Sequence, residues 1–385
     1  MAAITSRLGS LRTSRHANLV GATVLIGALA IFPLFRSPLD GFVDDCVLAL
    51  AYVVMALGLN IVVGFAGLLD LGFVAFYAFG SYAAGWFASD FFSSINHEKG
   101  IHIAAGEFAS TLPGIHLNFL LVLVAAVIIT SIAGMIIGLP TLRLRGDYIA
   151  IVTLAFGEII GRFAVNGEIG GFKYTNGRQA ISPVDTLDLP LMKELDSAFS
   201  IRGYYWVALA MVAFSLFVNF RLRDSRLGRA WIAIREDEVA AVSMGIPLVK
   251  TKLMAYAAGA AFGGLSGAFL GTYFNSVNAN QFQFAFSIFI LSMVILGGLG
   301  SIWGTVLGAI TLSFINSYFI PDVFNGIPGS LGLDFDLTQL SFGIFGFLLV
   351  IVMILRPEGL LPEKRRRIEL KEGIGGDDAI VEARL

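Results

Sequence analysis

Long apolar runs recur along the whole chain, and they constrain its fold more than any other feature of the sequence. A helix needs about 20 mostly apolar residues, each rising about 1.5 Å, to cross the hydrocarbon core of a bilayer. Only 14% of the 385 residues are charged, against about 25% in a typical soluble domain, so a soluble fold is excluded. The sequence therefore predicts an all-α fold, a polytopic transmembrane helical bundle of about ten spans, at residues 18–35, 46–64, 71–89, 118–139, 148–166, 204–220, 251–274, 284–301, 303–320 and 338–355.

The eighth and ninth of these spans are separated by a glycine-rich break. Residues 284–320 form one apolar run that is about twice as long as a single crossing requires. The segment "GGLGSIWG" interrupts this run at 297–304, and we therefore expect two helices there.

Lysine and arginine set the expected orientation. With a cytoplasmic N-terminus, ten spans return the C-terminus to the cytoplasm, and most of the 26 Lys and Arg residues then lie in cytoplasmic segments, as the positive-inside rule requires. The expected organisation is a basic cytoplasmic tail at 1–17, a transmembrane domain at 18–355 and a cytoplasmic tail at 356–385. The basic, acid-free start also fits a mitochondrial transit peptide, which is the alternative for residues 1–17.

Two long loops, 90–117 and 167–203, fall on the opposite side of the membrane in this orientation. The second loop mixes charges and contains Pro183 and Pro190. It is predicted to form either a small extracytoplasmic cap that meets a partner protein or a solvated connector.

A glycine stripe marks the seventh span, where Gly259, Gly263, Gly267 and Gly271 recur every four residues. Small residues at this spacing leave one smooth helix face, which allows another backbone to approach closely. We expect tight packing inside the bundle, and the alternative is a surface that slides against or pairs with another subunit.

Two oppositely charged residues lie within the fifth span. Ionisable side chains at membrane depth are costly, so they are functional candidates by default. Glu158 and Arg162 are four residues apart on one helix face, with the glutamate first, which is the order that favours an ion pair. They are predicted to neutralise each other, either as a structural pair or in the lining of a translocation path.

The segment "GLNIVVGFAGLLDLG" joins the second and third spans, and its glycines permit the chain to turn. Asp70 is predicted either to cap the third span or to lie in an unwound segment that lines a cavity. Asn60, inside the second span, either bonds helices together or lines a pore. The hypothetical translocation path therefore consists of Asn60, Gly64, Gly67, Asp70, Glu158 and Arg162.

Residues 221–252 form the long cytoplasmic loop between the sixth and seventh spans. The segment "RAWIAIREDEVAAVSMGI" predicts a short amphipathic helix that ends at Gly245, with Pro247 shortly after. Such a helix lies on the membrane surface or inserts into a groove on a partner. The acidic run at 236–238 disfavours an anionic lipid surface and favours a protein partner.

The sequence excludes several kinds of chemistry in this chain. It contains no G-x-x-x-x-G-K-[ST], H-E-x-x-H or G-x-S-x-G motif, so no nucleotide site, catalytic residue or metal site is expected. Cys46 is the single cysteine and cannot form an internal disulfide. The net charge of −2 gives no indication of nucleic-acid binding. Uphill transport would take its energy from a partner or from an ion gradient.

Four sequence blocks resemble one known family. They are "GLNIVVGFAGLLDLGFVAFYAFGSYAAG" at 58–85, "LPTLRLRGDYIAIVTLAFGEIIGR" at 139–162, "REDEVAAVSMGI" at 235–246 and "ILGGLGSIWGTVLGA" at 295–309. Together they are similar to the permease subunits of branched-chain amino acid ABC importers, and most similar to the larger, M-type subunit. The resemblance spans about residues 45–362.

This resemblance implies a subunit of the bacterial inner membrane, surrounded by lipid and without a cofactor of its own. Its partners would be a second homologous permease, two cytoplasmic ATPases that use ATP, and a periplasmic binding protein that delivers leucine, isoleucine or valine. The alternatives are a permease of the same family for urea or short amides, and a secondary transporter driven by an ion gradient.

The resemblance also implies that the 221–252 loop contains the coupling helix of ABC permeases. Ala240, Ala241 and Gly245 fit its EAA-x-x-x-G pattern, whereas Val239 replaces the glutamate. The ATPase-coupling residues are accordingly expected to be Arg235, Glu236, Glu238, Ala240, Ala241 and Gly245.

Overall fold

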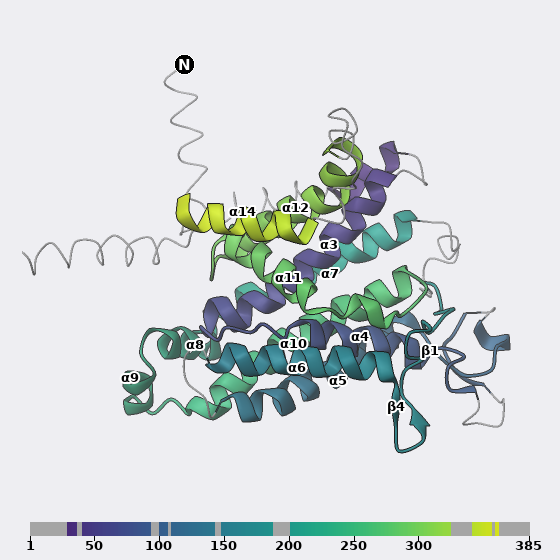
Figure 1. The fold of residues 1–385 in the computed structure, drawn as a ribbon, viewed down its shortest axis with the longest axis horizontal. Coiled ribbons are helices and arrows are strands. Elements are labelled where there is room, and N and C mark those ends of the chain that lie inside the picture. Colours follow the sequence, from purple (N-terminus) through teal and green to yellow (C-terminus); the bar gives the residue numbers. More distant parts are fainter. Residues whose placement is uncertain are drawn as a thin grey trace, which may run out of the picture.

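The chain folds as a helical bundle in a computed structural model that describes residues 29–36, 41–93, 100–106, 109–142, 148–187, 201–324, 341–355 and 359–361 (Figure 1). Within these residues, six helices are long and apolar enough to cross a membrane: Gly41–Phe65, Phe119–Thr141, Tyr148–Asn166, Ile201–Asp224, Leu248–Tyr273 and Ile302–Pro321. The predicted helical, polytopic membrane fold is confirmed. The count of about ten spans and the orientation of the termini stay predictions.

Nine of the ten predicted spans correspond to helices of the described chain. The helices are α3 (Gly41–Leu59) with its π-helical end η2 (Asn60–Phe65), α4 (Val74–Phe87), α5 (Phe119–Thr141), α6 (Tyr148–Asn166), α7 (Ile201–Asp224), α10 (Leu248–Tyr273), α11 (Phe284–Gly297), α12 (Ile302–Phe314) with its π-helical end η7 (Ile315–Phe324), and α14 (Ser341–Leu355). Of the first predicted span, 18–35, the described part begins at residue 29 and includes the 3-10 turn η1 (Phe32–Phe35). The tail at 1–17 lies outside the described residues, as does most of 356–385.

α4 and α11 are too short to cross a bilayer by themselves. They have 14 residues each, which rise about 21 Å against a hydrocarbon core of about 30 Å. Each adjoins an irregular segment, the 66–73 bend before α4 and the 298–301 turn after α11. Irregular backbone at membrane depth is tolerated where protein buries it.

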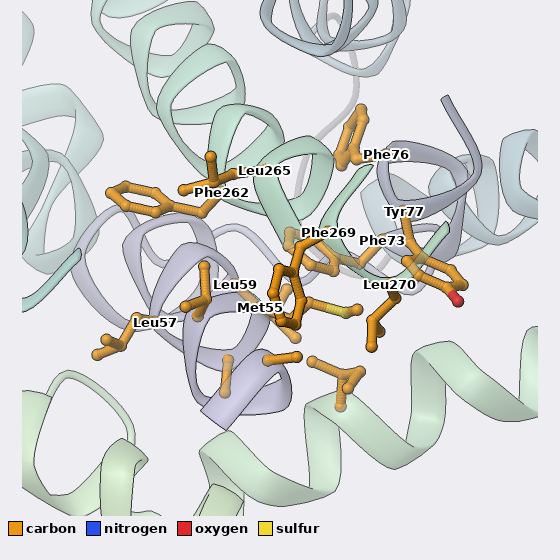
Figure 2. Packing of buried hydrophobic residues seen from close by; sticks show 14 of the residues in the cluster. Met55, Leu57, Leu59, Phe73, Phe76, Tyr77, Phe262, Leu265, Phe269 and Leu270 are labelled. Carbon is orange, nitrogen blue, oxygen red and sulfur yellow. The ribbon is translucent and has the colours of Figure 1, made fainter. Parts of the chain in front are cut away.

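The centre of the bundle is formed by α3, α4 and α10. Figure 2 shows side chains from these segments converging, with Met55 and Leu59 on α3 and Phe269 on α10. The rings of Phe73 and Phe76, at the start of α4, meet edge to face at 5.7 Å in the same cluster. α6 is the least buried of the candidate spans, with 28% of its most apolar window inside the chain against 78% for Gly41–Phe65.

The glycine stripe of α10 faces other segments of the same chain. A Cβ added at Gly267 would collide with the carbonyl oxygen of Tyr77 on α4. One added at Gly259 would collide with Val62 and lie 3.0 Å from the carbonyl oxygen of Gly58. Gly263 and Gly271 likewise lie against α4 or the residue before it. These glycines let the backbones of α10, α3 and α4 touch.

The two ends of the bundle differ in structure (Figure 1). One end carries short strands in the order β1 (Ala88–Ser89), β3 (Ile115–Leu117) and β2 (Ile101–Ile103), together with the β4–β5 hairpin (Glu168–Ile169 and Phe172–Lys173). Bridges from Ser89 to Val184 and from Ile181 to Val277 tie the loops of this end together. All these segments are ones that the charge pattern assigns to the extracytoplasmic side, and α8 and α9, described next, lie at the opposite end.

Candidate coupling and translocation site

The 221–252 loop forms two helices where the sequence predicted one. α8 (Arg226–Glu236) begins at Ser225, whose side chain accepts a hydrogen bond from the Gly228 amide at 3.1 Å. Asp237 has an extended backbone and ends α8; its carboxylate accepts from the amides of Val239 and Ala240 at 2.8 and 3.0 Å. Asp237 thus caps α9 (Glu238–Ser243). A single continuous helix was the wrong expectation, because an aspartate that caps the following turn stops the helix before it.

α9 ends where the sequence predicted. Gly245 has a φ of +83°, and the amides of Gly245 and Ile246 donate to the carbonyls of Val242 and Ala241 at 2.9 and 3.1 Å. These two bonds form a Schellman motif, in which glycine is favoured at the left-handed position. Within the described residues nothing lies within 4 Å of a Cβ added at Gly245, so a substitution there strains the backbone without a clash.

The inner side of the two loop helices is fixed to the start of α10. Trp231 is fully buried, and its indole nitrogen donates to the Thr251 carbonyl at 2.8 Å. Lys252 is buried and forms an ion pair with Glu238 of α9. The sequence reasoning missed Trp231 and Lys252 as functional residues. Two features of the sequence could have indicated them: a tryptophan lies in an otherwise polar loop, and a lysine lies at the start of an apolar span.

The outer side of α9 is apolar and exposed. Val239, Val242 and Met244 are 76%, 51% and 84% exposed, and Ala240 and Gly245 are exposed beside them. We call these five residues the α9 surface. Of the other predicted coupling residues, Glu236 is exposed, Ala241 is buried and Glu238 is paired with Lys252.

Arg235 points from α8 into the membrane domain. Its Nη1 donates to the carbonyl oxygen of Gly64 at 2.6 Å. Gly64 belongs to η2, the π-helical end of the second span. Gly67 follows with a φ of +69°, and a Cβ added there would collide with the Arg235 side chain.

Asn60, at the start of η2, forms a hydrogen bond with the 298–301 turn. The side chain is fully buried, and its Oδ1 accepts from the amide of Gly300 in the 298–301 turn at 2.9 Å. A Cβ added at Gly64 would collide with Asn60 and lie 2.6 Å from the Gly300 nitrogen. Asn60 therefore joins the second span to the 298–301 turn, which is the bonding role of the two predicted for it.

Asp70 is buried in the 66–73 bend and does not cap α4. Its Oδ1 accepts from the Gly72 amide at 2.9 Å, whereas α4 begins at Val74 after Phe73, with no side-chain cap. The Val74 amide donates instead to Ser287 Oγ at 3.0 Å. The capping expectation is wrong, because the carboxylate is used inside the bend. Asp70 Oδ2 has no hydrogen-bond partner among the described residues.

The 66–73 bend lies against α6. The Leu71 amide donates to Thr153 Oγ1 at 3.0 Å, and a Cβ added at Gly72 would collide with the Thr153 carbonyl. Gly157, one turn further along α6, also contacts Gly72, since its added Cβ would lie 3.1 Å from the Gly72 Cα. The bend and the middle of α6 therefore pack as one unit.

Glu158 and Arg162 lie on the outward face of α6. Both side chains are exposed, and the structure, which describes both residues, contains no ion pair between them. The predicted mutual neutralisation is thus absent. The six hypothetical path residues divide into a buried group around η2 and the bend, and an outward pair on α6.

A cavity of about 680 Å³ lies between α8, η2 and the start of α12. It is lined by Phe65, Phe220, Arg223, Asp224, Arg229, Ile232, Arg235, Ser301, Ile302 and Trp303. The cavity adjoins the Arg235 side chain. Within the described residues, no group of three or more His, Cys, Asp or Glu could hold a metal ion.

The described chain is a polytopic helical bundle whose loop helices are bonded to the second span and to α10, an arrangement that fits a membrane transport permease. Residues 42–353 match the family described as branched-chain amino acid transport system permease components. The chain belongs to this family.

Curated relatives agree with this assignment. The chain is 36% identical to the high-affinity branched-chain amino acid transport system permease protein LivM of Escherichia coli K12, over 86% of this chain and 73% of the relative. Identity to LivM of Salmonella typhimurium is 35% over the same shares. Similarity extends to the permease protein LivH of Escherichia coli K12, at 27% over 43% of this chain and 48% of the relative. No solved structure matches the chain.

Proposed function

We propose that this chain is one permease subunit of an ATP-binding-cassette importer that moves leucine, isoleucine and valine across the bacterial inner membrane. Family membership supports the substrate class. The similarity to LivH supports a second, homologous permease as its partner. Two cytoplasmic ATPases supply the energy, a periplasmic protein delivers the substrate, and this chain holds no cofactor.

The observation that carries the proposal is the two-sided structure of the 221–252 loop. Its outer side presents the α9 surface, where Val239 and Met244 expose apolar side chains to the aqueous side. Adjacent exposed apolar residues of this kind mark a protein interaction site. Its inner side is fixed by Trp231 and Lys252 and reaches the second span through Arg235. A partner protein that binds α9 can therefore displace the second span.

The outward face of α6 is the proposed lining of the translocation path. Charged side chains at membrane depth avoid lipid and face water or protein. Glu158 and Arg162 offer one negative and one positive group, as a zwitterionic amino acid requires. The face would lie between this chain and the second permease, whereas the 66–73 bend, which contains Asp70, packs against α6 from inside the bundle.

Uptake by the reconstituted complex tests the proposal. Proteoliposomes containing this chain, its companion permease and the ATPases are supplied with binding protein and labelled leucine. We expect uptake that needs ATP, that excess isoleucine or valine suppresses, and that urea and ionophores leave unchanged. Uptake that persists without the ATPases and collapses with the ion gradient would instead establish a secondary transporter, and competition by urea would establish the other substrate class.

A further inference from the structure

We propose that Arg235 is a positioning residue that transmits movement of α8 to η2, through Asn60 to the 298–301 turn and, through the 66–73 bend, to α6. This inference rests on the proposed function. It assigns the transmission to one side chain and to one hydrogen bond, from Arg235 Nη1 to the Gly64 carbonyl oxygen at 2.6 Å.

The first step is the attachment of α8. Trp231 lies one helical turn before Arg235 and is bonded to the Thr251 carbonyl at 2.8 Å. Residues four apart share a helix face, so α8 has one inward face, fixed to α10 at Trp231 and to η2 at Arg235. Displacement of α8 about its Trp231 attachment therefore acts on η2 through Arg235.

The second step is the fit of Arg235 in its site. The glycine at 67 leaves open the space in which the Arg235 stem lies, and its φ of +69° turns the chain around that stem. A guanidinium donating to a carbonyl in a partly buried site forms a hydrogen bond stronger than one between neutral groups. The Arg235 side chain and the η2 backbone are therefore expected to move together, whichever way α8 is displaced.

The third step runs from η2 in two directions. Asn60 Oδ1 accepts a hydrogen bond from the Gly300 amide at 2.9 Å, which transmits movement of η2 to the 298–301 turn. In the other direction, the Leu71 amide donates a hydrogen bond to Thr153 Oγ1 at 3.0 Å, which transmits movement of the 66–73 bend to α6. Glu158 lies on the outward face of that helix, just over one turn beyond Thr153. One arginine is thus connected to the 298–301 turn, to the 66–73 bend and to the charged face of α6.

The fourth step is the space for movement. The cavity of about 680 Å³ lies beside Arg235, between α8 and the start of α12. Protein interiors are close-packed and transmit displacement, whereas a cavity allows an element to shift. α8 can therefore move toward Trp303, which also lines the cavity.

Replacement of the arginine in the assembled importer tests the inference. Arg235→Gln is compared with Arg226→Gln, a change of the same type on the same helix. Arg226 is exposed at the start of α8 and is not among the residues that line the cavity. The measured quantity is leucine imported per ATP hydrolysed, per assembled complex in proteoliposomes.

For Arg235→Gln we expect ATP hydrolysis to continue while the number of leucine molecules imported per ATP hydrolysed falls about tenfold. A change of this size corresponds to the loss of one hydrogen bond from a charged group. Arg226→Gln keeps the wild-type ratio. Arg235→Lys retains a charged donor and restores at least half of the ratio. Gly67→Ala, which displaces the arginine without removing it, lowers the ratio as Arg235→Gln does.

Two results would overturn the inference. One is a wild-type ratio in Arg235→Gln. The other is a loss of hydrolysis and uptake in equal proportion in Arg235→Gln and Arg235→Lys, because that result indicates a structural role alone. Failure of the proposed function is distinguishable, since the wild-type complex would then show no ATP-dependent leucine uptake at all.

Discussion

Asn60 accepts a hydrogen bond from the Gly300 amide at 2.9 Å and so joins the second span to the 298–301 turn, 240 residues further along the chain. The contact buries an amide side chain completely. Its backbone donor lies in a turn where Gly298 and Gly300 both have positive φ values. This bond holds the π-helical end of the second span against the turn between α11 and α12.

Asn60→Ala should therefore destabilise the permease. The change leaves the Gly300 amide without its acceptor, and an unsatisfied buried donor costs about 1 to 3 kcal/mol. Thermal unfolding of the detergent-purified protein measures the loss. Asn166→Ala, at an exposed position of α6, is the matched control and should keep the wild-type midpoint. Equal midpoints for the two variants would show that the Asn60 bond contributes nothing.

Gly267→Ala should disturb the contact between α10 and α4. Its Cβ would collide with the Tyr77 carbonyl and lie 3.0 Å from the Ser81 nitrogen, and overpacking of this kind costs about 1 to 3 kcal/mol. Gly343→Ala, in α14, has nothing within 4 Å among the described residues. It should leave the midpoint unchanged or raise it slightly, because alanine favours helix. If both variants unfold alike, the stripe is not a tight contact.

Met244→Glu should weaken ATPase docking without unfolding the chain. Met244 is 84% exposed on the α9 surface, so the glutamate is solvated in the free permease but loses its water in the complex. We expect the Kd for the ATPase to rise about tenfold, since loss of a central interface contact commonly costs more than about 1 kcal/mol. Met244→Leu keeps the apolar character and should bind normally. Binding is measured by interferometry on the purified subunits, and an unchanged Kd for the glutamate variant would remove α9 from the interface.

Glu158→Gln and Arg162→Gln should lower leucine uptake with little change in stability. Both side chains are exposed on α6, so neither supports the packing of this chain. Loss of a charge that pairs with the substrate should reduce uptake about tenfold at low leucine concentration. Glu168→Gln, in the strand β4 at the end of the bundle opposite α9, is the control. Normal uptake in both α6 variants, at equal protein abundance, would exclude this face as the path.

The regular part of the fold was predictable from the sequence. Hydropathy alone placed the fifth span at 148–166, the bounds of α6, and the fourth within two residues of α5. These bounds follow from the length that a bilayer imposes on an apolar helix. Gly245 and Pro247 likewise marked the end of α9, because their backbone preferences are local.

The contacts of the site were not predictable in the same way. Arg235 donates to a backbone carbonyl 171 residues away, and any residue at position 64 would supply such a carbonyl. Asp70 was assigned to a helix cap from its residue type, whereas the bend brought its carboxylate to the Gly72 amide. Glu158 and Arg162 have the spacing of an ion pair, but spacing does not fix the rotamers of two exposed side chains.

The central claim is that the 221–252 loop couples ATP hydrolysis to transport, and stimulation of the ATPase by loaded binding protein tests it most directly. The chain offers a matched pair of variants: Gly245→Val at the end of α9 and Gly171→Val in the β4–β5 turn at the opposite end. Both glycines have a φ between 82° and 83°, and neither has an atom of the described chain near an added Cβ. The two changes therefore place the same β-branched side chain at the same positive φ. We predict that Gly245→Val abolishes the stimulation while Gly171→Val retains it; a fully stimulated rate in the assembled Gly245→Val complex would contradict the account.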